Sequence, residues 1–203
     1  RVLTEVIPRF KARYPDYRIE ITEQDLPSIT RMLLEENLDL GLMAANSVTP
    51  FDETHVHLLQ REEVLFAIPA SHPYAKENPS GPIAWKDLIR IFEKENFLLS
   101  RRDSSLRVLT DKLFESCRFA PSAMCETNSV TATCRMVENG IGVTFLGESC
   151  KDSSGPVAYY SLEPKLYRLN LLAHRKNWIL NPAEEFLCQL IRSSFPLSGA
   201  ENS

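Results

Sequence analysis

The residues with the clearest chemical potential lie in a polar turn that follows the apolar run Phe97–Leu99. Residues 100–107 contain three serines and three arginines, and apolar residues recur at helical spacing from Leu106 onward. A strand that enters a helix through such a turn presents backbone N–H groups and hydroxyls to a small anion or polar ligand. The turn could do chemistry, bind a ligand or cap the helix, and the residues concerned are Ser100, Arg101, Ser104 and Ser105.

Two further turns stand in the same relation to a predicted strand and helix. One follows a brief predicted strand at 123–126, and the other follows a predicted strand at 17–22. In an open α/β sheet, ligands bind at the carboxyl edge of the strands, although helix capping is the commoner role for any single serine, threonine or aspartate. The three turns together favour a ligand cleft, to which these two would contribute Gln24, Asp25, Thr127, Asn128 and Ser129.

The segments that partly resemble catalytic or cofactor-binding motifs do not match those motifs fully. Gly147-Glu148-Ser149 lacks the closing glycine of a nucleophile elbow. Gly140 and Gly142 precede a predicted strand, whereas a dinucleotide-binding fingerprint follows one. Adjacent carboxylates such as Glu35-Glu36 point in different directions on a helix and make poor acid–base pairs. We therefore expect no enzyme, no catalytic residue and no cofactor.

Two histidines are the nearest approach to a metal site. His55 and His57 would share one face of a strand, with Asp52 and Glu53 nearby. Two ligands on an exposed strand are more often solvated side chains, so we expect no bound metal. His72 and His174, which lie beside predicted domain junctions, are expected to make local hydrogen bonds.

Composition narrows the class of protein. The net charge of -4 argues against a grip on nucleic acid by this part of the chain. Five cysteines without CxxC spacing suit a reducing cytoplasm, where they serve as small buried apolar residues. No apolar run approaches the roughly 20 residues that span a bilayer. The chain begins at Arg1 without a signal-peptide pattern and reads as an excised fragment.

Strands and helices are predicted to alternate, which indicates an α/β protein. The pattern splits near Pro69–Pro73, and a chain that begins on a helix feeding a parallel sheet is expected to have lost a first strand. Pro8 predicts a kink or a later start in the first helix. The predicted elements are helix 3–14, strand 17–22, helix 27–37, buried parallel strand 38–44, strands 55–60 and 64–69 or one long strand, helix 84–90, strand 97–99, a helix ending near 118, strand 123–126, helix 130–139, strand 141–146, strand 166–173, helix 182–191 and a frayed tail to 203.

The order of these segments resembles the effector-binding (regulatory) domain of LysR-type transcriptional regulators over nearly the whole chain. The segments that carry the resemblance are Ile7–Phe10 with Tyr14-Pro15, Arg18–Ile21, Leu38–Leu42, Val64–Pro69 leading into Ser71–Ala75, Asn128–Val130, Val137–Val143 and Leu166–Arg175. Two departures stand out. The family's proline after the strand that ends at Leu146 is Gly147 here, and the pair Arg101-Arg102 favours an anionic effector.

The resemblance implies two Rossmann-like subdomains joined by two crossover strands, as in type II periplasmic binding proteins. Residues 1–69 with 170–203 would form regulatory subdomain I, without its first strand, and residues 70–169 would form subdomain II. The resemblance also implies a small-molecule effector between the subdomains, dimers and tetramers, cytoplasmic location, and DNA binding through an absent N-terminal winged helix-turn-helix. A transporter's periplasmic solute-binding protein and an enzyme of this fold remain as alternatives.

Overall fold

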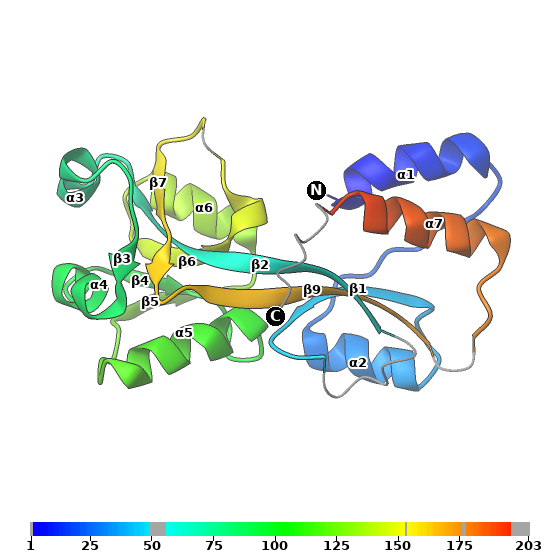
Figure 1. The fold of residues 1–203 in the computed structure, drawn as a ribbon, viewed down its shortest axis with the longest axis horizontal. Coiled ribbons are helices and arrows are strands. Elements are labelled where there is room, and N and C mark those ends of the chain that lie inside the picture. Colours follow the sequence, from blue (N-terminus) through cyan, green and yellow to red (C-terminus); the bar gives the residue numbers. More distant parts are fainter. Residues whose placement is uncertain (1, 49–55, 153, 176–177, 196–203) are drawn as a thin grey trace, which may run out of the picture. The chain divides into compact units, whose positions relative to one another are not determined.

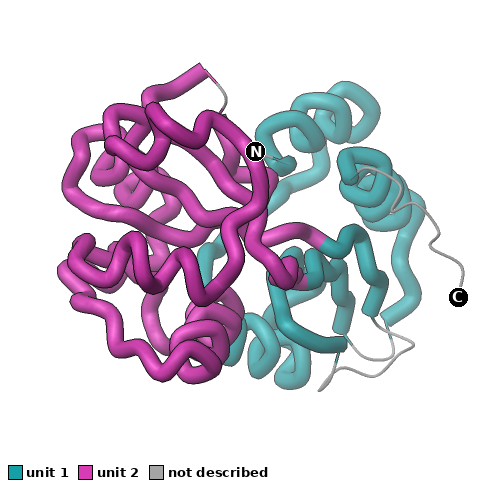
Figure 2. Tube along the Cα trace, turned by 60° about the vertical axis from the view of Figure 1, so that its left-hand side comes forward, with its two compact units in different colours: residues 1–61, 169–203 teal, residues 62–168 magenta. Residues whose placement is uncertain are grey.

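The computed structural model describes residues 2–48, 56–152, 154–175 and 178–195. The chain forms two compact units, shown in Figure 2: unit 1 consists of residues 1–61 and 169–203, and unit 2 of residues 62–168. Both boundaries fall inside strands, because β2 (Val56–Pro69) and β9 (Leu166–His174) each contribute residues to both units. The chain therefore passes between the units within two strands, which Figure 1 lets the reader follow.

Unit 1 is a layered arrangement around β1 (Leu40–Ala45), which pairs antiparallel with β9. Leu172 of β9 packs with α1 (Val2–Arg13) and α7 (Pro182–Ser193). Its neighbours Leu171 and Ala173 pack instead with α2 (Leu26–Leu34). Successive residues of a strand point to opposite faces, so α1 and α7 cover one face of these strands and α2 covers the other (Figure 1).

Unit 2 contains the parallel strands β6 (Val143–Gly147), β4 (Phe97–Leu99) and β5 (Ala123–Glu126), with β2 antiparallel to β6. Phe97 and Leu99 pack with α5 (Ser105–Ser116), whereas Leu98 packs with Val137 of α6 (Val130–Glu138). The two helices therefore cover opposite faces (Figure 1). The remaining elements are α3 (Pro73–Glu77), β3 (Ile83–Ala84), α4 (Trp85–Phe92), the 3-10 helix η2 (Glu148–Cys150), β7 (Val157–Tyr160) and β8 (Leu162–Glu163).

The strand predicted at residues 17–22 is wrong. Tyr17 and Ile19 pack against the core of unit 1, but Ile21, which alternation places on the same face, is exposed. Within the described part of the chain this segment pairs with no strand and forms no ladder. The buried parallel strand predicted at 38–44 is also corrected: β1 pairs antiparallel with β9, and its burial alternates.

Helix boundaries follow the local chemistry closely. Asp25 accepts a hydrogen bond from the Ser28 backbone N–H at 2.8 Å and caps α2. Glu36, at a φ of 61°, ends this helix earlier than predicted. Gly140 has a φ of 73° and marks the end of α6. This left-handed conformation suits a residue without Cβ. Helix α1 continues through Pro8. Of the two alternatives for residues 55–69, two short strands or one long strand, the structure has one long strand, β2. The elements α3, β3, η2, β7 and β8 were not predicted from the sequence, and the tail beyond 195 lies outside the described residues.

Candidate functional site

The turn before α5 and the turn before α6 are joined through Asn128. The backbone N–H of Arg101 donates to Asn128 Oδ1 at 3.0 Å. The Asn128 amide Nδ2 in turn donates to Asp103 Oδ1 at 3.3 Å. A third bond runs from the Thr127 backbone N–H to the Leu99 carbonyl at 3.0 Å, because β4 and β5 are neighbouring parallel strands. The sheet thus brings together two turns that lie 27 residues apart in sequence.

Several predicted site residues also cap helices. Ser104 Oγ accepts the Arg107 backbone N–H at 3.0 Å at the start of α5, and Ser129 Oγ accepts the Ala132 backbone N–H at 3.3 Å at the start of α6. Thr127 Oγ1 accepts the Ser129 backbone N–H at 3.1 Å. Each of these hydroxyls keeps its own hydrogen to donate to a ligand. Capping and ligand binding are therefore compatible roles at these positions.

The remaining predicted residues of unit 2 differ in exposure. Ser105 is buried, and the Ser100 carbonyl accepts a hydrogen bond from Arg107 Nη1 at 3.0 Å. The Arg101 side chain is 65% exposed, and its Nη2 lies 3.7 Å from Asp103 Oδ2. Arg101 and Arg102 are both exposed: Arg101 lies beside Asp103, and Arg102 lines a separate pocket.

Gln24 and Asp25 belong to unit 1. Asp25 caps α2, and Gln24 Nε2 donates to Thr22 Oγ1 at 3.4 Å. Their participation in the same ligand site as the turns of unit 2 stays a prediction.

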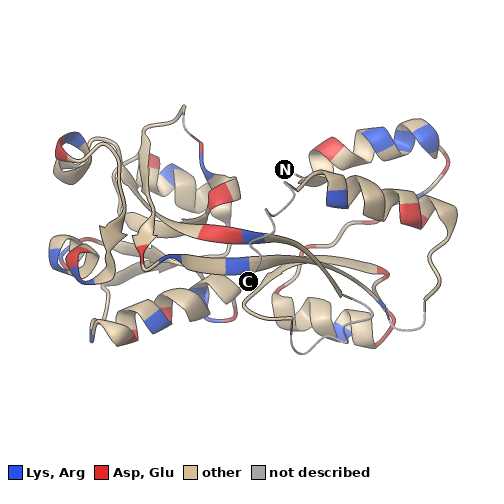
Figure 3. Cartoon of the chain, in the orientation of Figure 1, with Lys and Arg blue, Asp and Glu red and all other residues tan. Residues whose placement is uncertain are grey.

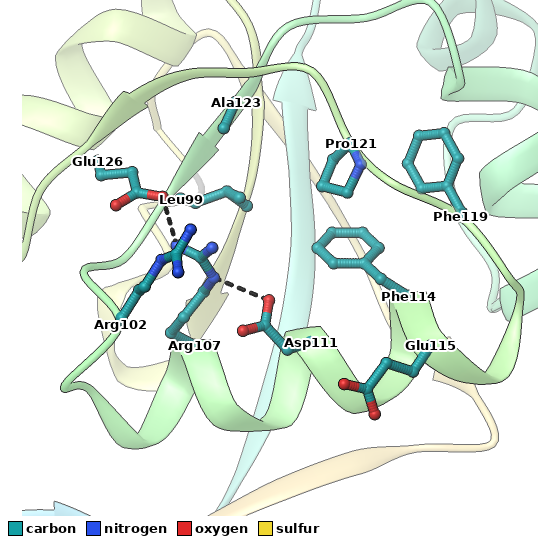
Figure 4. Close-up of a pocket in the computed structure, with 10 residues that line it drawn as sticks. All are labelled: Leu99, Arg102, Arg107, Asp111, Phe114, Glu115, Phe119, Pro121, Ala123 and Glu126. Atoms are coloured by element: carbon teal, nitrogen blue, oxygen red, sulfur yellow. Dashed lines mark hydrogen bonds and ion pairs between the residues drawn. The ribbon is translucent and has the colours of Figure 1, made fainter.

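A pocket of about 290 Å³ lies between α5 and β5, and sequence reasoning did not find it. Figure 4 shows Arg102, Arg107 and Glu126 at one end, Phe114, Phe119 and Pro121 at the other, and Asp111 between them. We call this cavity the α5–β5 pocket; its lining is Leu99, Arg102, Arg107, Asp111, Phe114, Glu115, Phe119, Pro121, Ala123 and Glu126. The sequence signal that could have indicated it is the spacing of Arg107 and Asp111, which places them on one face of a helix.

Arg107 is the central charged group of this pocket. Its side chain is 9% exposed and forms ion pairs at 2.8 Å with both Asp111 and Glu126. Burial lowers the pKa of Arg107, but the hydrogen bonds to Glu126 and Asp111 outweigh that effect and raise the pKa above its ordinary value. The hydrogen bond from Arg107 holds the pKa of the Glu126 carboxyl below its usual range. The guanidinium of Arg107 and the carboxylate of Glu126 therefore stay charged at neutral pH.

A second buried ion pair explains why Gly147 departs from the family's proline. Glu62 is fully buried, and its Oε2 accepts from Arg168 Nε at 2.6 Å while its Oε1 accepts from the Ser149 backbone N–H at 2.9 Å. A Cβ added at Gly147 would lie 2.3 Å from Arg168 Nη2 and 2.6 Å from Glu62 Oε1. This pair occupies the space that a proline ring would need. Burial raises the pKa of Glu62, yet Arg168 and Ser149 together leave the pKa below its ordinary value.

Figure 3 shows positive and negative side chains on several helices; on α1, Glu5 lies in the first turn and Lys11 and Arg13 lie in the last. Within the described residues, no group of three or more His, Cys, Asp or Glu side chains is placed to hold a metal ion. His55, Asp52 and Glu53 lie outside those residues. His72 caps α3 by accepting the Tyr74 backbone N–H at Nδ1, over 3.1 Å.

The five cysteines form no disulfide, and the prediction that they are buried holds fully for only one of them. Cys188 is buried, while Cys117, Cys125, Cys134 and Cys150 are half-buried. Burial raises the pKa of Cys134 and of Cys188, which makes these thiols poor nucleophiles. No helix in the described ranges is long and apolar enough to cross a bilayer.

The layers, the two strands that run through both units and the turns at strand ends define a mixed α/β domain of the type II periplasmic-binding-protein-like fold. The structure matches the effector binding domain of QuiR in complex with shikimate, with a TM-score of 0.70, 23% identity, and coverage of 95% of this chain and 90% of that one. It also matches the regulatory domain of Synechocystis PCC6803 CcmR in complex with 2-PG, with a TM-score of 0.74, 14% identity, and coverage of 96% and 93%.

The family whose pattern matches is the LysR substrate binding domain, over residues 1–196. The chain belongs to this family. A curated relative is the transcriptional activator protein LysR of Escherichia coli (strain K12), which is 31% identical over 144 residues, or 71% of this chain and 43% of the relative. The chain spans 43% to 64% of the length of the curated relatives it matches.

Proposed function

We propose that the chain is the effector-sensing part of a bacterial LysR-type, DNA-binding transcriptional regulator. The effector is a small organic anion, bound at the turns before α5 and α6 of unit 2. The observation that carries this proposal is the bond from Arg101 to Asn128, which fixes the two turns side by side. Two helix N-termini with serine caps then present hydroxyl and backbone donors close to one exposed arginine.

The chemistry of these turns favours an anion. Helix N-termini carry partial positive charge and unsatisfied N–H groups. Arg101 lies 3.7 Å from Asp103, beyond hydrogen-bond distance, so its guanidinium is available to a ligand carboxylate. QuiR and CcmR, named above with shikimate and 2-PG, support small-molecule binding by this fold. We further propose that Gln24 and Asp25, in the turn that begins α2, contribute to the same site.

The rest of the proposal concerns the whole protein. Units 1 and 2 would be regulatory subdomains I and II, and effector binding would change their relative orientation. An N-terminal winged helix-turn-helix would bind DNA in the cytoplasm. Self-association into dimers and tetramers is supported by exposed apolar side chains such as Met124 and Val130, which are 59% and 43% exposed. The regulator LysR among the relatives favours this reading over a transporter's solute-binding protein.

Thermal denaturation with and without organic acids tests the effector site. We expect shikimate, benzoate or a related carboxylate to raise the melting temperature, and Arg101→Gln to remove that increase. The matched control is Arg135→Gln, which removes another exposed arginine of unit 2, on α6. Binding that survives Arg101→Gln together with Asn128→Asp would refute the assignment.

A further inference from the structure

We propose that the α5–β5 pocket is a second ligand site, which binds a free α-amino acid with an apolar side chain. None of the residues predicted for the effector site lines this pocket. The inference rests on three properties of the pocket. One guanidinium nitrogen has no hydrogen-bond acceptor within the described residues, positive and negative side chains lie together at one end, and aromatic side chains lie at the other. It does not depend on the function proposed above.

The open nitrogen is Nη2 of Arg107. The Nε of this side chain donates to Asp111 at 2.8 Å, and Nη1 donates to Glu126 at 2.8 Å and to the Ser100 carbonyl at 3.0 Å. In the described part of the chain, Nη2 has no such acceptor. No buried polar side-chain atom there lacks a partner, so solvent reaches Nη2 through the pocket. The two N–H groups of Nη2 are charged donors that can each hydrogen-bond a carboxylate oxygen.

The charges around Arg107 select against a simple anion. Arg102 adds a second guanidinium, and Asp111 and Glu126 add two carboxylates, whereas Glu115 lies beside Phe114 (Figure 4). Asp111 accepts from Arg107 at Oδ1 and Glu126 at Oε1, which leaves Oδ2 and Oε2 to accept from a ligand. A lone carboxylate would face two negative groups, and a lone amine would face two positive ones. A ligand carrying both charges on one carbon atom satisfies both sets.

The opposite end of the pocket is apolar. Phe114 and Phe119 lie with ring centroids 5.8 Å apart, and Pro121 lies beside them (Figure 4). A volume of about 290 Å³ is at the lower limit of ligand pockets and suits a molecule of amino-acid size. The α-carbon would lie among the charged groups, and the side chain would pack against the two rings.

Three probes separate the contributions of the two charges. L-phenylalanine carries both groups, 3-phenylpropanoate lacks the ammonium, and 2-phenylethylamine lacks the carboxylate. Calorimetric titration of the whole chain is expected to show L-phenylalanine binding about tenfold more tightly than either analogue, because each loses charge-assisted hydrogen bonds. Amide resonances of Leu99, Ala123 and Glu126 in NMR spectra should shift on binding, which locates the ligand in this pocket.

Variants complete the test. Arg102→Gln and Glu126→Gln each remove one charge from the pocket while leaving a polar side chain of similar size, and each is expected to weaken L-phenylalanine about tenfold. Arg90→Gln, an exposed arginine of α4, is the control for general charge effects. The proposal is overturned if L-phenylalanine does not bind, if 3-phenylpropanoate binds equally well, or if the shifted amides lie in residues 127–129 instead of the pocket.

Discussion

The backbone N–H of Arg101 donates to Asn128 Oδ1 at 3.0 Å, and this bond ties the turn before α5 to the turn before α6. Asn128 also donates through Nδ2 to Asp103, so one amide side chain uses both of its ends between the two turns. A substitution of Asn128 can therefore test ligand binding while keeping the bond that holds the two turns together.

Asn128→Asp is expected to abolish the thermal stabilisation by an organic acid while leaving the fold intact. Aspartate keeps the oxygen that accepts from Arg101 but replaces the Nδ2 donor by a negative charge beside Asp103, which repels an anionic ligand. Thermal denaturation with and without shikimate or benzoate measures the effect. Asn37→Asp, at an exposed position of unit 1, is the control. An unchanged thermal response in Asn128→Asp would place the effector elsewhere.

Arg107→Met should destabilise unit 2 by about 2 kcal/mol, because removing a buried guanidinium leaves Asp111 and Glu126 without their partner. Both carboxylates are partly exposed, which keeps the loss below that of a fully buried pair. Urea denaturation measures the change in the free energy of unfolding. Arg90→Met removes a surface pair with Asp87 and should cost less than about 1 kcal/mol. Equal losses in the two variants would contradict the role given to Arg107.

Gly147→Ala is expected to lower the free energy of unfolding by about 1–3 kcal/mol, since the added Cβ would collide with the Glu62–Arg168 pair. Gly155→Ala provides a matched control, because the nearest atoms to its Cβ would be 3.9 Å away. Urea denaturation of both variants decides the matter. If Gly147→Ala were as stable as the control, the ion pair would not be what excludes a side chain at residue 147.

Stability should fall as the pH drops below about 6.5. Burial lowers the pKa of His57 first, and the positive charges of Arg192 and His174 lower it further. The unfolded chain then takes up a proton at His57 before the folded chain does, so stability is full above the unfolded pKa and declines toward the folded one. Urea denaturation between pH 5 and 8 measures this slope, and His57→Gln should make it shallower. A slope unaffected by this substitution would assign the pH dependence to other groups.

Much of the fold could be predicted because local chemistry decides it. The boundaries of α5 and α6 follow from Ser104 and Ser129 as caps, and β4 follows from an uninterrupted apolar run. The segment at 17–22 shows where this reasoning ends. Its alternation correctly places Tyr17 and Ile19 against the core but fails for Ile21, which is exposed. A ladder also needs a neighbouring strand, and alternation contains no information about neighbours.

The sequence likewise indicated one part of the candidate site and not another. Residues 100–105 and 127–129 were chosen because they follow strands, and the parallel pairing of β4 with β5 does bring these two turns together. The α5–β5 pocket was missed, because Arg107 and Glu126 are brought into contact by the same pairing while neither lies in a recognisable motif. Long-range ion pairs of this kind depend on tertiary packing and leave only weak traces in local patterns.

The position of Arg107 has a consequence for how specificity can evolve. One guanidinium holds the Ser100 carbonyl in the first turn and also presents Nη2 to the α5–β5 pocket. A mutation at this codon would alter both regions together, so the two cannot diversify independently through it. Arg101 and Arg102 are adjacent in sequence, but Arg101 lies beside Asp103 and Arg102 lines the α5–β5 pocket. Substitutions at these two positions can therefore change the two regions separately.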